Sequence, residues 1–230
     1  MLQKIIVSNC ASENFFELLD KNSIYYIKSL NNEKFNNNYN DHIDLSILKI
    51  DNDIYIENSV FEYYKDFLKD YNLKKVDVSD FKNGEMVLNV AKNDKYFFHN
   101  EKFTTKEIFE SLNLKREYVK INQGYSNCSM ICFKNHIITS DEGVFKSLKS
   151  ININVELVTT TGIILNGYKN GFIGGTCGFV SDDTLLFYGD VTKYQDYDII
   201  KRVADEENVK ILFPKGEDFV DLGGIVSLWR

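Results

Sequence analysis

Two cysteines and a histidine lie close together in the chain, as Cys128, Cys132 and His136. Cysteine and histidine side chains are common zinc ligands, and a cysteine beside a histidine can act as a nucleophile. The residues around them indicate a β-hairpin, in which eight residues of extended chain span about 26 Å. Cys128 and His136 are then too far apart to share one ion, and Cys128 and Cys132, about 13 Å apart, lie beyond disulfide distance. We therefore expect no metal site here, and Cys128 remains as a candidate nucleophile.

Two carboxylates, Asp44 and Glu85, occupy corresponding places at the start of predicted strands. Paired carboxylates can hold a guanidinium or ammonium group, because charge-assisted and bidentate hydrogen bonds are the strong ones. His42 lies two residues before Asp44 and could serve as a base if its loop turns inward. Solvated strand ends would explain the same acids, and the sequence leaves both interpretations open.

The remaining histidines and cysteines suit structural roles. His99 is expected to be a surface or capping residue and His136 a turn residue, whereas Cys10 and Cys177 are expected to be small core residues. The loop 164–172 could cover a ligand, with Tyr168 or Lys169 touching it, but a plain connection fits it as well.

Composition excludes several classes of protein. The chain has 230 residues and a net charge of −7, which argues against a nucleic-acid partner. No apolar run reaches the ~18 residues that a membrane span needs, and the apolar run at the N-terminus is too short for a signal peptide. Four cysteines without a dense framework favour a cytoplasmic protein. The sequence does not indicate the oligomeric state.

A repeated pattern supplies the elements that would position these residues. Segments 41–79, 84–122, 124–159 and 171–214 each show two apolar runs around a polar turn, then a helical pattern and a third strand. The turns centre on Asn52, Asn93, Asn135 and Asp182, residue types that tolerate the left-handed backbone of tight hairpins. Helix starts are predicted at Ser59 and Asp141, and at a capping box that begins at Thr104. The repeated unit is β-β-α-β.

The two ends of the chain complete a fifth unit. Residues 222–230 resemble a first strand, and residues 1–30 a second strand, a helix and a third strand. We expect the N- and C-terminal strands to pair and close a single domain over 1–230, with Trp229 and Arg230 helping the closure and 31–40 as an Asn-rich linker. The fold class is thus α/β, a five-bladed α/β propeller. An ordinary α+β protein with coincidental hairpins is the alternative.

Strand alternation divides the first strands into two faces. One face is apolar and includes Leu45, Met86, Cys128 and Cys177; we expect it under the helices. The other is small and polar and is expected to line the ring centre; its candidate ligand-binding residues are Asp44, Glu85, Asn127, Ser129, Gly174, Thr176 and Gly223. A register slip of one residue would exchange the faces and turn Cys128 inward.

Five such units in a ring resemble the penteins, the α/β propellers of guanidine-modifying enzymes such as arginine deiminase, agmatine deiminase and dimethylargininase, and of a ribosome anti-association factor. The strings "GYSNCS", "IITSDEG", "GFIGGTCG" and "DLGGIVSL" are also similar to a bacterial pentein-like family of unknown activity. The enzymes carry a cysteine in the closing strand and a histidine as acid or base. Here the closing strand "GGIVSLWR" offers Ser227 instead, and "GGTCGFV" has no histidine.

The resemblance implies a hydrolase or transferase, amidinohydrolase- or amidinotransferase-like, that binds a small guanidino or amino compound at the ring centre without a cofactor. The candidate catalytic residues are Cys128, His42 and Ser227. The missing cysteine and histidine favour the alternative, a non-catalytic pentein that binds a small ligand or a protein.

Overall fold

The computed structural model describes residues 4–228 and contains five three-stranded sheets. The first two sheets are β15 (Val226–Ser227), β1 (Lys4–Val7) and β2 (Tyr25–Lys28), then β3 (Ile47–Ile50), β4 (Asp53–Glu57) and β5 (Asn72–Val76). The third is β6 (Ala91–Lys92), β7 (Tyr96–His99) and β8 (Glu117–Lys120). The last two are β9 (Met130–Cys132), β10 (Ile137–Thr139) and β11 (Val155–Leu157), then β12 (Cys177–Ser181), β13 (Thr184–Phe187) and β14 (Lys210–Leu212).

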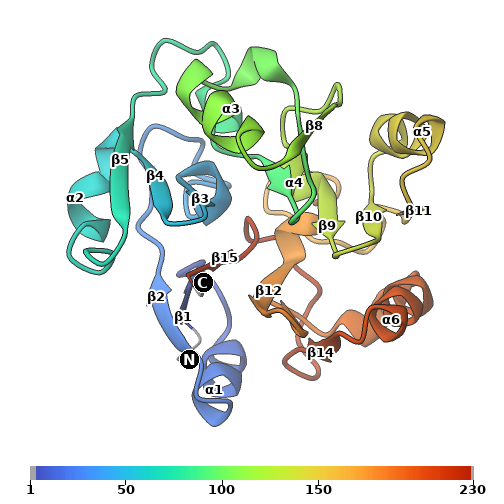
Figure 1. Cartoon of the computed structure of the whole chain (residues 1–230). Helices are drawn as coiled ribbons and strands as arrows, with labels where there is room; N and C mark the ends of the chain where they lie inside the picture. The colour runs from blue at the N-terminus through green and yellow to red at the C-terminus, as the bar shows by residue number, and fades with distance from the viewer. Residues whose placement is uncertain (1–3, 229–230) are drawn as a thin grey trace.

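In every sheet the first two strands are antiparallel and the third is parallel to the middle one. A helix connects each parallel pair, as such a crossover requires. These helices are α1 (Glu13–Lys21), α2 (Phe61–Tyr64), α3 (Lys106–Asn113), α5 (Glu142–Ser150) and α6 (Tyr197–Glu206). They lie at the periphery, and the first strands lie toward the middle (Figure 1).

The N- and C-terminal strands pair, as predicted. β1 is antiparallel to β15, with Ile5 opposite Ser227 and Ile6 opposite Val226. The pairing completes a three-stranded sheet; among residues 4–228 no sheet closes on itself. The roles predicted for Trp229 and Arg230 fall outside the described residues.

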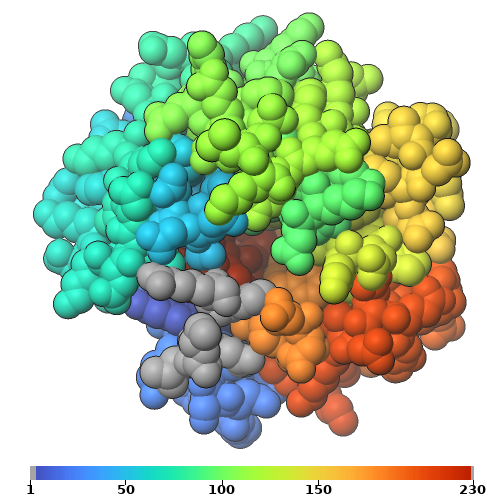
Figure 2. Space-filling view, in the orientation of Figure 1, coloured from blue at the N-terminus to red at the C-terminus, as the bar shows by residue number. Residues whose placement is uncertain are grey.

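Five apolar clusters connect the sheets. One joins Ile6 and Ile27 to Ile47, and the next joins Leu48 and Tyr55 of the second sheet to the third. Two more clusters join the third sheet to the fourth and the fourth to the fifth, and the last cluster joins the fifth sheet back to the first. The coloured sectors of the chain accordingly sit side by side around the middle of the molecule (Figure 2).

This packing contradicts the prediction of one polar face per first strand. Ile47 and Leu48 point to opposite sides of β3, and both are buried, in two different clusters. Each sheet is packed between two neighbours, so both of its faces need apolar side chains. The polar residues therefore lie where the chain enters a strand, not along one face of it.

The chain enters the inner strands through short helical turns, where extended strand was predicted. Asp44 lies in the 3₁₀ turn Ile43–Leu45, Glu85 in Gly84–Met86 and Gly174 in Gly174–Thr176. Asn127 and Cys128 lie in the single-turn helix α4 (Ser126–Ser129). Further 3₁₀ turns are Asn58–Val60, Glu101–Phe103 and Val191–Lys193. Successive side chains project about 100° apart in an α-helix and about 120° apart in a 3₁₀ turn, so strand alternation cannot describe these segments.

The predicted helix caps and turn residues agree with the structure only in part. Asp141 caps α5 through a hydrogen bond from the amide of Val144, as expected. The cap of α3 is Thr105, one residue after the predicted Thr104, and Ser59 lies inside a 3₁₀ turn and caps no helix. The left-handed residue of the first hairpin is Asp51, with φ of +54°, and none of the four predicted turn residues has a positive φ.

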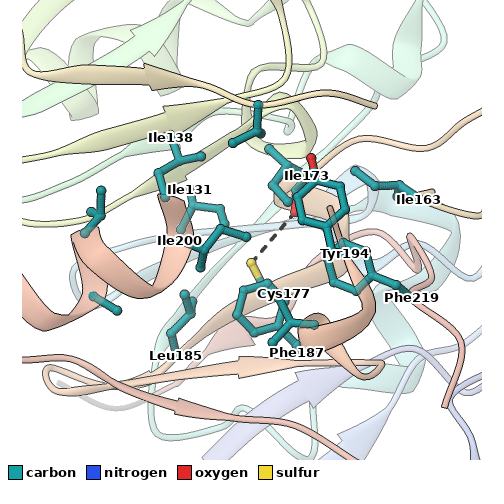
Figure 3. Close-up of a cluster of buried hydrophobic side chains, with 14 of the residues drawn as sticks. Ile131, Ile138, Ile163, Ile173, Cys177, Leu185, Phe187, Tyr194, Ile200 and Phe219 are labelled. Atoms are coloured by element: carbon teal, nitrogen blue, oxygen red, sulfur yellow. Dashed lines mark hydrogen bonds between the residues drawn. The ribbon is translucent and has the colours of Figure 1, made fainter. Parts of the chain in front are cut away.

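The cysteines divide between core and surface. Cys177 packs among isoleucines and aromatic rings, with its thiol directed to the carbonyl of Ile173 (Figure 3), which agrees with the prediction. Cys10 is exposed, contrary to the prediction, because it follows the end of β1.

Candidate functional site

Asp44 is a buried carboxylate with one oxygen left without a partner. Its side chain is 3% exposed. Oδ2 accepts hydrogen bonds from Asn127 Nδ2 at 3.1 Å and from the Cys128 thiol at 3.0 Å. Oδ1 is closed from solvent and accepts no hydrogen bond from any described residue. Buried carboxylate oxygens are normally satisfied, so Oδ1 is the strongest single indication of a binding site in the molecule.

Asn89 holds the turn that carries Asn127 and Cys128. Its Oδ1 accepts hydrogen bonds from the backbone amides of Asn127 at 2.9 Å and Cys128 at 3.2 Å. Its Nδ2 donates to Cys128 Sγ at 3.1 Å. The thiol is thus held between Asn89 and Asp44. Asn89 was not selected from the sequence as a site residue, although its polar side chain between Leu88 and Val90 was a usable signal.

Burial determines the protonation states of Asp44 and Cys128. It raises the pKa of Asp44 from 3.8 to about 6, an effect that the hydrogen bonds from Cys128 and Asn127 partly oppose. Burial, together with the negative charge of Asp44, raises the pKa of Cys128 well above its usual value. At neutral pH the ligand-free site therefore combines an ionised carboxylate with a neutral thiol.

Asp221 is a second buried acid that sequence analysis missed. Its Oδ2 accepts from the amide of Phe172 at 2.8 Å and its Oδ1 from the amide of Gly223 at 3.1 Å. Burial raises its pKa, which the charge of His42 partly opposes and that of Asp44 reinforces. The charges of Asp221, His42 and Asp44 therefore interact. A lone aspartate before two glycines in the sequence carries no signal of this proximity.

His42 and Gly223 lie against one another beside Asp44. The amide of Asp44 donates to the carbonyl of Gly223 at 3.2 Å, and a Cβ on Gly223 would lie 2.2 Å from that of His42. Gly223 has φ of +77°, which L side chains rarely adopt. The imidazole nitrogens of His42 form no hydrogen bond with another described residue. Gly223 thus has a backbone role, and the His42 ring lies next to that of Tyr39.

Glu85 stands among aromatic residues. It accepts a hydrogen bond from the Tyr125 hydroxyl at 3.0 Å, and the Tyr125 ring stacks near Phe172 with centroids 6.5 Å apart. The ring of Tyr39 lies 6.1 Å from those of both His42 and Tyr168. Burial, followed by the charge of Glu85, raises the pKa of Tyr125. We call Glu85, Tyr39, Tyr125, Tyr168 and Phe172 the acidic–aromatic rim.

Four of the predicted site residues have structural partners instead. The Ser227 hydroxyl donates to the Phe179 carbonyl of the neighbouring sheet. Ser129 and Thr176 each donate to the carbonyl three residues earlier, as hydroxyls in short helical turns often do. Gly174 has no room for a side chain. The structure brings none of these four into hydrogen-bonding contact with Asp44.

His99 is buried and contacts α4, the turn that carries Cys128, contrary to the prediction of a surface or capping role. It is 1% exposed, and its Nδ1 lies 2.9 Å from the Ser126 hydroxyl in α4. Burial lowers its pKa to about 4, so the ring is neutral at physiological pH. His136 lies in its turn, 2.7 Å from Glu207. Within residues 4–228 no group of three or more His, Cys, Asp or Glu side chains is arranged to hold a metal ion.

Two shallow surface depressions lie away from Asp44. One is lined by residues including Asn14, Lys21 and Pro214, and the other by residues including Tyr55, Lys74 and Glu107. Both are mostly open and contain none of the buried acids. None of the helices described in residues 4–228 has the length and apolarity that a membrane crossing requires.

Thiol labelling tests the burial of Cys128. Burial and the charge of Asp41 raise the pKa of Cys10, but Cys10 is the exposed cysteine of the four, so in the native protein at pH 7.5 we expect it alone to react in the fast phase with a thiol reagent. Burial holds Cys128 as a thiol and raises the pKa of Cys132 to about 12. Cys10→Ser should abolish the fast phase, while all remaining thiols react in denaturant. A fast phase that persists in Cys10→Ser contradicts the described site.

The sequence of the chain matches one known protein family. The model of the family of unknown function DUF6873 matches residues 6–226. No curated protein sequence matches the chain.

Several solved structures share this fold at low sequence identity. DDAH from Pseudomonas aeruginosa, in complex with citrulline, has a TM-score of 0.56 at 8% identity, over 93% of each chain. Agmatine deiminase from C. jejuni has 0.51 at 12% identity, over 93% of this chain and 77% of that one. Inosamine-phosphate amidinotransferase StrB1 from Streptomyces griseus has 0.55 at 11% identity, over 92% and 77%. The fold is that of the pentein superfamily, as predicted from the sequence.

Proposed function

The chain belongs to the family of unknown function DUF6873, and from this starting point we propose that it binds a small guanidino or amino cation beside Asp44. The observation that carries the proposal is the unpartnered, buried Oδ1 of Asp44. Leaving an ionised oxygen buried without a donor costs free energy, and a guanidinium or ammonium N–H is the donor that best offsets this cost.

We further propose that residues 1–230 form one domain, a five-bladed α/β propeller with the blades 222–230 plus 1–30, 41–79, 84–122, 124–159 and 171–214. The five apolar clusters that join successive sheets, the last sheet to the first included, support this arrangement. The strand entries then meet near the middle, where Asp44 contacts both Asn127 and Gly223. The four free cysteines fit a reducing compartment such as the cytoplasm.

Cys128 is the nucleophile that this geometry offers for a hydrolase or transferase. A cation bound to Asp44 would lower the pKa of the adjacent thiol. The sulfur would then bond to the guanidinium carbon, and the thiol proton would pass to the departing nitrogen as the C–N bond breaks. Water, or an amine acceptor in a transferase, would break the C–S bond. Ser227 is engaged with Phe179 and is not part of this proposal.

The raised pKa of Cys128 favours a second function, binding without catalysis. No described base hydrogen-bonds to the thiol apart from the weakly basic Asp44, so a resting thiolate is disfavoured. Release of ammonia or amine from guanidino compounds separates the two functions. Turnover that is lost in Cys128→Ser supports the enzyme, whereas binding without turnover in the wild type supports the binding protein.

Calorimetric titration tests the binding itself. We expect n-butylguanidine and n-butylamine, both cations at pH 7.5, to bind the wild-type protein with Kd below about 1 mM. Neutral n-butylurea has the same chain without the charge and should give no binding heat. Equal heats for the cations and the urea would overturn the proposed function.

A further inference from the structure

The acids around the proposed site outnumber the bases. Asp41 and Asp221 are buried with Asp44, and Glu85 is half-buried. Among residues 4–228 no lysine or arginine forms an ion pair with any of these four acids. Elsewhere in the molecule, the buried Glu57 and the partly exposed Asp51 do pair with basic side chains. The strand entries therefore form a negative region that no described lysine or arginine neutralises, although the charge of His42 acts on Asp221.

These acids belong to one connected set of contacts. Asp44 reaches Gly223 through its amide, and Gly223 donates to Asp221. Asp221 accepts from Phe172, whose ring stacks with Tyr125, and Tyr125 donates to Glu85. Asp41 accepts from the Ser8 hydroxyl, and the Ser8 amide donates to the Tyr188 hydroxyl, which in turn donates to the Gly224 carbonyl. Asp44 and Glu85 thus lie at two ends of a single cluster.

We propose that the ligand carries two positive charges and no carboxylate, with one cation at Asp44 and the other at the acidic–aromatic rim beside Glu85. This inference rests on the proposed function and names its substrate class, a diamine or a guanidino-amine. The uncompensated acids attract the two cations and would repel an α-carboxylate. The unpartnered Asp44 Oδ1 is the independent sign that a donor belongs inside this acidic cluster.

The rim has the composition of a site for an ammonium group. Aromatic rings within about 6 Å of a cation attract it through their electron-rich faces, and a nearby carboxylate adds a charge-assisted hydrogen bond. The rings of Tyr39 and Tyr168 are tilted by 42° with centroids 6.1 Å apart, and Tyr168 is 49% exposed. Burial, and then the charge of Tyr168 and of Glu85, raise the pKa of Tyr39, so the three side chains are within electrostatic reach.

The loops that bear these tyrosines also contact each other. Asn166 donates to Asn38 at 3.5 Å, and a Cβ on Gly167 would lie 2.2 Å from Asn38 Nδ2. Tyr39 and Tyr168 follow directly after these residues. The predicted linker 31–40 and the loop 164–172 therefore meet at the rim.

A set of matched ligands tests the substrate class by calorimetry. We expect 4-aminobutylguanidine to bind the wild type at least 10-fold more tightly than n-butylguanidine, which lacks the second charge. Arginine, which adds a carboxylate, should bind at least 10-fold more weakly than 4-aminobutylguanidine. Glu85→Gln should remove the advantage of the second charge, so that 4-aminobutylguanidine binds the variant less than about 3-fold more tightly than n-butylguanidine does. Glu110→Gln removes an exposed acid that faces Lys106 and is the control for net charge.

The outcomes separate this inference from the proposed function. If n-butylguanidine binds but the second charge brings no gain, or if arginine binds as tightly as 4-aminobutylguanidine, the dication inference is overturned and the proposed function stands. An unchanged gain in Glu85→Gln overturns the assignment of the rim. If none of the cations binds, the proposed function and this inference both fail. Circular dichroism and the melting temperature of Glu85→Gln verify that the variant is folded.

Discussion

Asp44→Asn is expected to weaken the binding of n-butylguanidine by about 100-fold while making the ligand-free protein more stable at pH 7.5. A charge-assisted hydrogen bond in a buried site contributes about 1.5–3 kcal/mol, and the neutral amide also presents an N–H₂ group that repels the ligand's donors. Oδ1 has no donor among the described residues, so the ligand-free protein loses only the hydrogen bonds at Oδ2. Calorimetry gives the affinity, and urea unfolding gives the stability.

The pH dependence of the stability has a definite sign. Burial raises the pKa of Asp44 from 3.8 to about 6 in the folded protein. The folded state then binds this proton more tightly than the unfolded state does. The contribution of Asp44 to the free energy of unfolding is therefore fully present below pH ~4 and is lost as pH rises through about 6. The loss approaches about 3 kcal/mol above pH 6. Asp44→Asn does not titrate, so its advantage over the wild type should grow between pH 4 and pH 7.

Asp51→Asn is the matched control with the opposite sign. Arg116 hydrogen-bonds Asp51 at 2.9 Å and lowers the pKa of that carboxyl to about 2. Its stabilisation is present above pH ~4 and is lost as pH falls toward 2. Because Asp51 is 36% exposed, the variant should lose only about 1 kcal/mol at neutral pH. If both variants lose stability at pH 7.5, or if Asp44→Asn binds n-butylguanidine as the wild type does, the described role of Asp44 is wrong.

Gly174→Ala is expected to cost about 3–5 kcal/mol of unfolding free energy and to leave little folded protein. A Cβ at this position would lie 2.0 Å from the Asn127 carbonyl oxygen and 2.4 Å from that of Met130. Both atoms are backbone, so neither can rotate away, and the turn Gly174–Thr176 must separate from α4. Because α4 also carries Cys128, the same change should disturb the Asp44 site. Urea unfolding and thiol labelling of Cys128 measure the two effects.

Gly216→Ala separates steric crowding from backbone strain. Gly216 has φ of +85°, and a Cβ added there would meet nothing within 4 Å, so alanine should cost only about 1 kcal/mol. Gly174 is a ligand-binding residue by the sequence prediction and a close-packing residue by the structure. If Gly174→Ala keeps wild-type stability and loses only ligand binding, the ligand-binding role is right and the steric one is wrong.

Much of the fold could be predicted because it depends on short-range pattern. Alternating apolar runs, polar turns and helix signals recur along the chain, and each records how a local segment must bury its side chains. The pentein resemblance and the pairing of β1 with β15 followed from these patterns and agree with the structure. Turn and cap positions were less accurate, as with Thr105 and Asp51, since neighbouring residues compete for them.

The arrangement of polar residues could not be derived in the same way. Alternation was applied to Asp44, Glu85 and Asn127, but all three lie in helical turns whose side chains point in three directions. Ser227 and Thr176 have polar side chains like those of the site, yet they bond to nearby carbonyls. Nothing in the sequence alone distinguishes a hydroxyl that satisfies its own backbone from one that faces a ligand.

The β-β-α-β unit, the order of strands and helices, and the acids and cysteine near the strand entries can all be derived from the sequence. The hydrogen-bonded group of Asp44, Asn89, Asn127 and Cys128 becomes visible only in three dimensions, as does the proximity of Asp221 and His42, whose charges interact. The reason is physical: local periodicity is encoded by neighbours along the chain, whereas burial, unmet hydrogen bonds and shifted pKa values arise where distant segments meet.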